Sequence, residues 1–450
     1  MIPTVRSLAR LPGDVRVREM RQGQFDRVFD AIRRAGAAKD AACGFFVPGR
    51  IEVLGKHTDY AGGRSLLCAM ERGFALASAP RNDRCVHVVN ADTGESVTCE
   101  IDPDLTPRVG TWTGYPLTVV RRLARNFPSF ECGATLAFTS DLPPAAGLSS
   151  SSALLVAVYL GLAEVNGLDG QRLFKEAIGT REELAGYLAA IENGRSFGPL
   201  DGDTGVGTFG GSEDHTAILC CREGHLAQYA FSPARLERQV RLAEDLVFVV
   251  ADCGIEARKT GNARERYNRA SRLAARVAEI WRCARGQHAS ALGNAVDSGG
   301  RACEQIRAVL REAGDAEFSA RELLERFEQF SVESGELVPA ASDALERGDL
   351  THFGLLVDRS QQAAEAWLHN QIPETIALAA LARQQGALAA SAFGAGFGGS
   401  VWALVPDADR RRFAEGWKGA YVARFRGHAT RARFLSTRPG PAAYRLEWRT

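Results

Sequence analysis

Lysine, methionine and long apolar runs are scarce in this chain of 450 residues. The chain has three methionines and only five lysines: Lys39, Lys56, Lys175, Lys259 and Lys418. Its 55 basic residues face 54 acidic ones, which leaves a formal net charge of +1. General binding of nucleic acid or of an anionic membrane surface requires net or clustered positive charge. We therefore expect no nucleic-acid partner and no membrane partner.

No apolar run is long enough to cross a bilayer. The longest, residues 153–163, is shorter than the roughly 18 residues that a membrane-spanning helix needs. Residues 1–20 contain charged side chains throughout, without the apolar segment of a signal peptide. Ten cysteines are scattered without a C-x-x-C pair or a zinc-like spacing, which is typical of reduced thiols. We expect a cytoplasmic protein.

Three stretches rich in glycine and small residues divide the chain: residues 47–64, 142–153 and 391–400. Between them the residue patterns predict short strands at 135–139, 246–251 and 401–405. They also predict a helix at 153–164 and a set of packed helices from 262 to about 347. This mixture predicts an α+β (mixed α/β) enzyme of two domains with a boundary near residue 240.

The middle stretch joins an expected strand to the start of an expected helix. Backbone N–H groups are unpaired at a helix N-terminus, so an anion is stabilised there. Gly147 is closely followed by four serines, Ser149 to Ser152, whose hydroxyls can donate to phosphate oxygens or bind Mg²⁺. The G-K-[ST] of a Walker A loop is absent. A simple capping loop is the alternative, but four consecutive serines exceed what capping needs.

The last stretch happens to match the pattern G-x-G-x-x-G, beginning at Gly394 and Gly396. A dinucleotide-binding fingerprint follows a strand and opens a helix, whereas this stretch precedes an expected strand. We therefore interpret it as a glycine-rich turn that lets the backbone approach a ligand or another loop.

The first stretch contains the densest chemistry. Arg50, Lys56, His57 and Asp59 lie within one short segment between glycines. A carboxylate accepts hydrogen bonds and an imidazole can donate or accept, so Asp59 and His57 can bracket neighbouring hydroxyls of a polyol. Each residue alone could be a solvated loop charge, but four in one such loop favour a ligand site.

Taken together, the three stretches resemble the three motifs of the GHMP kinases, a family of ATP-dependent kinases of small molecules. The first, G-R-x-x-x-x-G-x-H-T-D-Y-x-x-G, resembles the galactokinase signature. Residues 210–215 and 264–269 resemble segments that place an acidic catalytic residue and a sugar-contacting tyrosine. The resemblance implies a GHMP kinase-like fold with an N-terminal domain at 1–245 and a C-terminal domain at 246–450. The active site would lie in the cleft between them.

The same resemblance implies the reacting groups. Arg50 would stand beside the transferring phosphoryl group and stabilise charge as it develops. Asp214 would accept the proton of the anomeric hydroxyl or position that hydroxyl, and an adjacent arginine is expected to keep it ionised. His57, Asp59 and Tyr267 would line the sugar pocket.

The resemblance also implies contacts to ATP and to Mg²⁺. The residues that would wrap the phosphates or close the wall beside them are Gly147, Leu148, Ser149, Ser150, Ser151, Ser152, Gly394, Gly396 and Gly398. Ser151 and Glu192 match positions that bind Mg²⁺. We expect ATP, Mg²⁺ and a small sugar as the ligands, and a monomer or weak homodimer.

Two departures from the family pattern concern the sugar. Lys56 replaces a glutamate that reaches the C6 hydroxyl of galactose, and a lysine favours a carboxylate at C6, as in galacturonate or glucuronate. Alternatively, Lys56 pairs with Glu52 or Asp59 and never meets the sugar. His215 replaces a glutamine after the catalytic aspartate, where it orients Asp214 or packs, and the loop at 198–207 is longer.

These residues predict an ATP- and Mg²⁺-dependent kinase acting on the C1 hydroxyl of galactose or a related sugar. One alternative is a uronic acid 1-kinase, similar to galacturonokinase or glucuronokinase. The other is a non-catalytic galactokinase-like sugar sensor. The presence of both Arg50 and Asp214 favours an enzyme.

Overall fold

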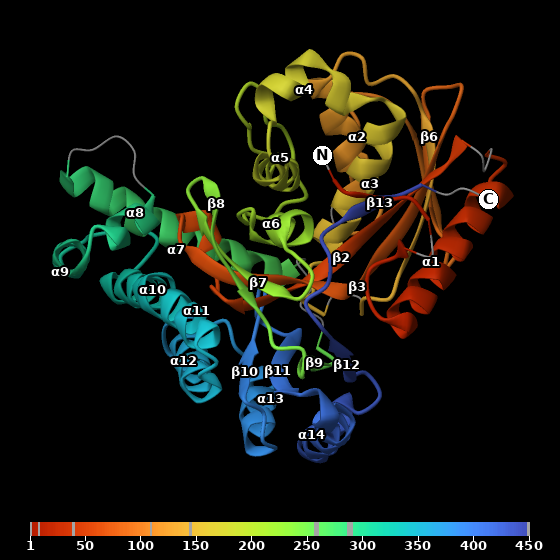
Figure 1. Cartoon of the computed structure of the whole chain (residues 1–450). Coiled ribbons are helices and arrows are strands. Elements are labelled where there is room, and N and C mark those ends of the chain that lie inside the picture. The colour runs from red at the N-terminus through yellow and green to blue at the C-terminus, as the bar shows by residue number, and fades with distance from the viewer. Residues whose placement is uncertain are drawn as a thin grey trace.

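The computed structural model describes residues 2–7, 10–37, 41–108, 110–143, 146–255, 261–285 and 291–447. Pro144 and Ala145 of the serine-rich stretch lie outside these residues. The described chain forms two β-sheets with helices on their faces, which confirms the mixed α/β fold predicted from the sequence (Figure 1).

The larger sheet has nine strands. Its main path runs β1 (Thr4–Val5), β13 (Tyr444–Leu446), β2 (Cys43–Leu54), β3 (Arg64–Pro80), β6 (Ala134–Ser140), β4 (Cys85–Asn90) and β5 (Ser96–Glu100). The hairpin of β7 (His225–Phe231) and β8 (Ala234–Arg241) pairs with the first residues of β3. In β2 the register shifts between Pro48 and Arg50 and again between Glu52 and Leu54. Such irregularities re-aim side chains, here on both sides of Arg50.

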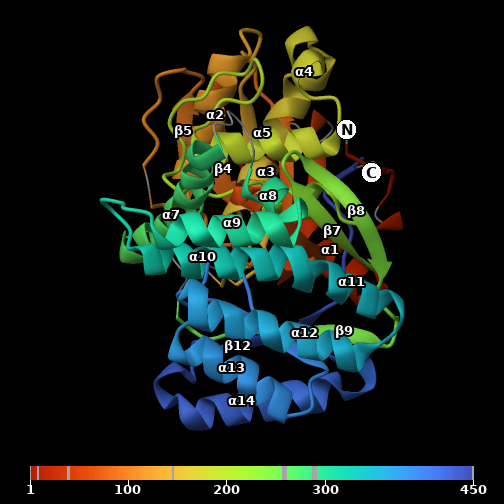
Figure 2. The same cartoon turned by 90° about the vertical axis from the view of Figure 1, so that its left-hand side faces the viewer.

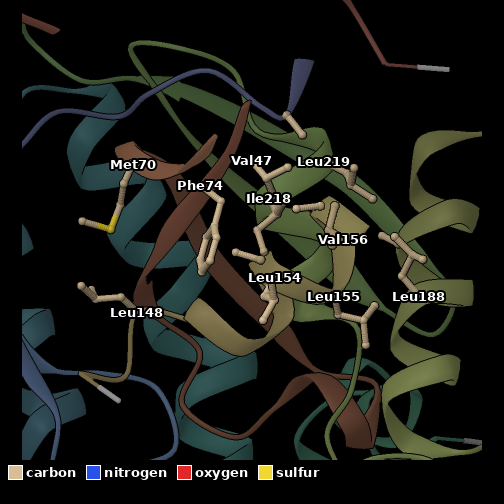
Figure 3. Packing of buried hydrophobic residues seen from close by; sticks show 14 of the residues in the cluster. Val47, Met70, Phe74, Leu148, Leu154, Leu155, Val156, Leu188, Ile218 and Leu219 are labelled. Carbon is tan, nitrogen blue, oxygen red and sulfur yellow. The ribbon is translucent and has the colours of Figure 1, made fainter. Parts of the chain in front are cut away.

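Helices cover both faces of this sheet. Alternate residues of β3 belong to different clusters, because successive side chains in a strand point to opposite faces. One face packs on α1 (Val15–Arg34). The other face packs on α3 (Ser150–Val165), flanked by α2 (Gly114–Asn126), α5 (Arg181–Asn193) and α6 (Glu213–Cys220). Figure 3 shows Leu154, Leu155 and Val156 of α3 among core residues from the sheet, α5 and α6.

The smaller sheet is antiparallel, in the order β10 (Ala389–Ala392), β11 (Ser400–Pro406), β9 (Leu246–Asp252) and β12 (Arg433–Thr437). Helices α13 (Pro373–Gln384) and α14 (Arg410–Arg424) cover one face. The other face packs on α12 (Leu350–Ala363) and joins the core of the larger sheet.

A helical layer lies beside the two sheets. It contains α7 (Gly261–Arg285), α8 (Leu292–Asp297), α9 (Gly300–Arg311), α10 (Ala320–Val332) and α11 (Val338–Glu346). Figure 2 shows α12, α13 and α14 stacked below α10 and α11. A π-helical turn, Glu333–Leu337, joins α10 to α11, and a second, Ala364–Leu368, follows α12.

Four local expectations are confirmed. The predicted strands correspond to β6, β9 and β11, and the predicted helix to α3. The last strand, β13, returns to the larger sheet and pairs with β2, so residues of the predicted C-terminal domain contribute to both sheets. Among the described residues, no helix is both long and apolar enough to cross a membrane.

Candidate active site

Two adjoining cavities meet where the three glycine-rich stretches come together. The smaller has a volume of about 50 Å³ and the larger about 520 Å³. Arg50 and Ala395 line both. A molecule in one cavity therefore lies next to a molecule in the other, with the Arg50 guanidinium at the junction.

Arg50 and Asp214 form a buried ion pair at this junction. Nε of Arg50 donates to Oδ1 of Asp214 at 2.8 Å, and Nη1 donates to the carbonyl oxygen of Gly147 at 2.7 Å. Burial lowers the pKa of Arg50, but the carboxylates of Asp214, Glu52 and Glu213 outweigh it, so that pKa is raised. The guanidinium is therefore a fixed positive charge within a water-poor site.

The serine-rich loop opens the larger cavity. Gly147 and Ser149 both have left-handed backbone conformations, with φ of 75° and 55°. Ser149 precedes α3 without capping it through its side chain, and its buried hydroxyl has no hydrogen-bond partner among the residues that the structure describes. Ser149, Ser150 and Ser151 line this cavity together with Gly147. Hydroxyls and free N–H groups at a helix N-terminus suit phosphate oxygens.

Aromatic side chains form the opposite wall of the larger cavity. Phe74, Trp112, Tyr115 and Phe138 line it. The Phe138 ring lies 5.8 Å from the Phe74 ring and 5.3 Å from the Trp112 ring, measured between centroids. A cavity with an apolar aromatic part and a polar phosphate-binding part suits a nucleotide.

Glu192 and the serines place side-chain oxygen atoms beside the junction. Ser152 donates to Oε2 of Glu192 at 2.8 Å and to Oδ2 of Asp214 at 3.4 Å. Nε2 of His215 lies 3.2 Å from Oε2 of Glu192. Within the described chain no cluster of three or more His, Cys, Asp or Glu side chains is arranged to hold a metal. Mg²⁺ usually needs only one or two carboxylates, because phosphates and water complete its shell, so this donor set fits Mg²⁺.

His57 links the first and last glycine-rich stretches. Its Nε2 lies 3.1 Å from the carbonyl oxygen of Ala395 and its Nδ1 lies 2.9 Å from the Tyr60 hydroxyl. A carbonyl only accepts, so Nε2 carries the hydrogen and, in the neutral ring, Nδ1 accepts from Tyr60. The His57 ring also lies 5.2 Å from the Tyr267 ring, between centroids. His57, Tyr60 and Tyr267 all line the smaller cavity.

Asp59 connects the first stretch to α6. Its Oδ2 accepts from the N–H of Glu213 at 3.1 Å and so caps the helix that presents Asp214. A side chain on Gly211 would place Cβ 2.3 Å from the same oxygen. The close approach explains glycine at position 211, and Asp59 also lines the smaller cavity.

Lys56 does not line either cavity. The side chain is buried at 1% exposure, and Nζ donates to the Ser360 hydroxyl at 2.7 Å. The Lys56 ammonium thus faces Ser360 on α12, far away in the sequence, and not the smaller cavity. Its charge also lowers the pKa of Glu52, one of the two partners expected for it.

Two further glutamates line the smaller cavity, Glu52 of β2 and Glu213 of α6. Burial raises the pKa of Glu52 to about 7, although the nearby Arg50 and Lys56 cations lower it. Burial and the proximity of Glu52 also raise the pKa of Glu213. Both shifts therefore favour the neutral form of these two carboxyl groups.

The remaining predicted residues have different positions. Gly394 lines the smaller cavity, whereas Leu148, Gly396 and Gly398 line neither. Leu148 is in the core, and a Cβ on Gly396 would lie 2.4 Å from the carbonyl oxygen of Asn370. The long loop contributes Gly205 and Val206 to the larger cavity. The structure thus brings together most, but not all, of the predicted set.

Sequence reasoning missed several residues that line the cavities. Glu52 follows Arg50 by two residues and Glu213 directly precedes Asp214 within the same motifs. This proximity in the sequence is a signal that could have identified both glutamates as residues of the site. The aromatic wall comes from β3, β6 and the start of α2 with the segment before it, and no local pattern joins those segments.

The chain matches three family models. They describe the GHMP kinases N-terminal domain at residues 114–202, the galactokinase galactose-binding signature at 33–80, and the GHMP kinases C-terminal region at 341–423. The crystal structure of Lactococcus lactis galactokinase complexed with galactose has a TM-score of 0.75 at 22% identity. It covers 92% of this chain and 98% of that chain, and it establishes a shared fold.

Galactokinases are also similar in sequence. One from Actinobacillus pleuropneumoniae serotype 5b is 35% identical over 149 residues, which is 31% of this chain and 38% of the relative. That alignment spans well under half of the relative's length. One from Roseiflexus sp. is 27% identical over 383 residues, 83% of this chain and 86% of the relative.

These matches show that the chain carries the N-terminal and C-terminal domains of the GHMP kinases, a superfamily of ATP-dependent kinases of small molecules. Within that superfamily it carries the galactokinase galactose-binding signature, and galactokinases are its homologues.

Proposed function

We propose that the protein is an ATP-dependent sugar kinase of the galactokinase type. It transfers the γ-phosphoryl group of ATP to the anomeric hydroxyl of galactose or a closely related neutral sugar. The observation that carries the proposal is the Arg50–Asp214 ion pair at the junction of the two cavities. The larger cavity has the features of a nucleotide site, and the smaller has hydrogen-bonding groups suited to a polyol.

The chain's own residues account for the reaction. The sugar C1 oxygen forms a bond to the γ-phosphorus, the bond to the β-phosphate oxygen breaks, and the hydroxyl proton passes to Asp214. Phosphoryl transfer is accelerated mainly by positioning and charge stabilisation. Arg50 supplies the fixed charge at the junction, and α3 with its serines holds the phosphates.

Mg²⁺ belongs to the proposal as well. Glu192 with the hydroxyls of Ser151 and Ser152 would hold it, which adds Ser152 to the pair expected from the sequence. When bound, Mg²⁺ neutralises charge on the phosphates.

A neutral sugar is favoured over a uronic acid. The smaller cavity is lined by the carboxyl groups of Glu52, Asp59, Glu192, Glu213 and Asp214. Arg50 is already paired with Asp214, and the Lys56 ammonium is bound to Ser360. A sugar carboxylate would thus meet like charge, which costs binding energy.

The test is ADP release by the purified protein with MgATP and galactose, galacturonate, glucuronate, arabinose or fucose. We expect the highest turnover on galactose or another neutral sugar, with loss of the reducing end in the product. Preference for a uronate would overturn the assignment of the sugar. Binding of ATP and sugar without turnover would identify a sensor instead.

Asp214→Asn tests the reacting group. We expect turnover to fall at least about a hundredfold, because general-base assistance contributes at least that much. ATP affinity, measured by titration calorimetry, is expected to stay within about threefold. Asp30→Asn on the exposed face of α1 is the control. Unchanged kcat in Asp214→Asn would contradict the role of this carboxylate.

A further inference from the structure

A row of buried polar side chains on α10 and the π-helical turn after it faces the backbone of residues 55–57. Arg326, Gln329 and Glu333 are three and four residues apart, so they share one face of the helix. None is more than 2% exposed. Buried polar groups destabilise a fold unless their hydrogen bonds are made, so the partners of these three explain their presence.

Each of the three side chains binds main-chain groups of the loop formed by residues 55–59. Oε1 of Glu333 accepts from the N–H of Gly55 at 2.7 Å and from the N–H of Lys56 at 3.3 Å. Nε2 of Gln329 donates to the carbonyl oxygen of Lys56 at 3.0 Å. The Arg326 guanidinium donates to the carbonyl oxygen of His57 and to the Tyr60 hydroxyl.

The loop requires this support because of its backbone conformation. Gly55 has φ of 113° and His57 has φ of 59°. A left-handed conformation is unfavourable for a residue with a side chain and persists where the surroundings hold it. The loop also sets the direction of His57 toward Ala395 and of Asp59 toward α6.

Lys56 belongs to the same network. Its Nζ donates to the Ser360 hydroxyl, and that hydroxyl donates to Oε1 of Glu333 at 2.9 Å. The charge of Lys56 therefore faces the carboxylate that holds the loop, through one serine. This network explains a lysine at position 56, where the galactokinase signature has a glutamate, without a contact to the sugar.

A second loop is supported in a similar way. The π-helical turn at 364–368 leads to Asn370, whose carbonyl oxygen accepts from the N–H of Phe397 at 2.6 Å. The described residues contain two π-helical turns. One begins at Glu333, which binds the loop of residues 55–59, and the other precedes Asn370, which binds the loop that contains Phe397. Such turns often occur at functional sites.

We infer that Arg326, Gln329 and Glu333 are positioning residues that set sugar affinity by fixing the loop from Gly55 to Asp59. None of the three lines a cavity, so they act through His57 and Asp59. The kinetic consequence rests on the proposed function. The structural consequence does not, because the hydrogen bonds to the loop exist without a substrate.

The experiment compares Glu333→Leu, Glu333→Gln, Gln329→Met and Glu336→Gln in the full chain. An amide oxygen still accepts from the two N–H groups, so Glu333→Gln keeps the support that Glu333→Leu removes. Glu336 lies on the same π-helical turn but pairs with Arg359 at 2.7 Å, and its side chain is 53% exposed. It is the matched control. The readouts are KM for galactose, KM for ATP, kcat and amide hydrogen exchange of residues 50–60.

We expect Glu333→Leu and Gln329→Met to raise KM for galactose at least about tenfold, since they remove bonds to a charged group or a buried carbonyl. KM for ATP should stay within about threefold, and exchange of residues 50–60 should rise. Glu333→Gln and Glu336→Gln should remain within about threefold of the parent in every readout.

Unchanged exchange and unchanged galactose KM in Gln329→Met would overturn the inference, as would an equal loss for galactose and ATP. Gln329→Met decides the matter if Glu333→Leu does not fold. A parent protein that turns over no sugar would overturn the proposed function. In that case, hydrogen exchange alone would test the support of the loop.

Discussion

At the scale of single residues, the site is defined by how charges are paired. Arg50 pairs with Asp214, Lys56 binds Ser360, and Glu52 lies beside Glu213. The first pair lies at the junction of the two cavities, and the second is buried away from them. In the third, burial raises the pKa of both carboxyl groups.

The raised pKa of Glu52 gives a prediction for how the free energy of unfolding depends on pH. Burial raises the pKa of Glu52 to about 7, so the folded protein binds a proton at this carboxyl group more tightly than the unfolded chain. This contribution is fully present below about pH 4.5 and is lost as the pH rises to about 7. We expect the unfolding free energy of the Glu52→Gln variant to decrease less than that of the parent over this pH range, by on the order of 1 to 3 kcal/mol.

Urea unfolding at intervals from pH 5 to pH 8 measures this effect. The exposed Glu100 of β5 provides the control variant Glu100→Gln, which should follow the parent. Parallel curves for Glu52→Gln and the parent would show that Glu52 does not retain its proton in the folded state.

At the scale of elements, the position of α6 depends on a residue from another segment. Ser212 makes no side-chain cap, and the Asp59 carboxylate caps the N-terminus instead. The helix that carries Asp214 is thereby tied to the loop that carries His57. Contact between the two segments is close enough to require glycine at 211.

Gly211→Ala tests this connection. The new Cβ would displace the Asp59 carboxylate, uncap α6 and shift Asp214 relative to Arg50. We expect kcat/KM for the sugar to fall at least about tenfold and stability to fall by about 0.5–2 kcal/mol, the usual cost of a lost cap.

Gly170→Ala is the matched control, because no atom lies within 4 Å of its Cβ. Steady-state kinetics and thermal unfolding distinguish the two variants. Identical behaviour would mean that α6 does not depend on Asp59.

At the scale of the whole molecule, the two sheets share one core. Phe248 and Trp402 of the smaller sheet are in the same cluster as Val47 and Leu148 of the larger part. The strand β13 also returns from the smaller sheet to pair with β2. The parts are therefore joined by packing and by connectivity.

We expect one cooperative unfolding transition. Scanning calorimetry, far-UV circular dichroism and tryptophan fluorescence should give coincident curves, because neither sheet keeps its core when the other unfolds. MgATP should shift this single transition upward, since it binds only the folded state. Two separated transitions would contradict the shared core.

The sequence by itself determined the main local elements, the resemblance to the GHMP kinases and a set of candidate residues, most of which line the two cavities. Arg50, Asp214 and the serines lie in short motifs, and the resemblance implies their roles. The strands at β6, β9 and β11 and the helix α3 followed from residue pattern, because propensity and periodicity act over neighbouring residues.

Only the tertiary structure decided where side chains point and what they meet. It places the Lys56 ammonium at the Ser360 hydroxyl and the Glu52 carboxyl beside that of Glu213. It also brings the residues of the aromatic wall together from segments far apart in the sequence. In addition, it places Arg326, Gln329 and Glu333 against the loop of residues 55–59. The physical reason is that these contacts join segments distant in sequence. Their formation depends on packing of the whole chain and on backbone irregularities in β2 and after α10.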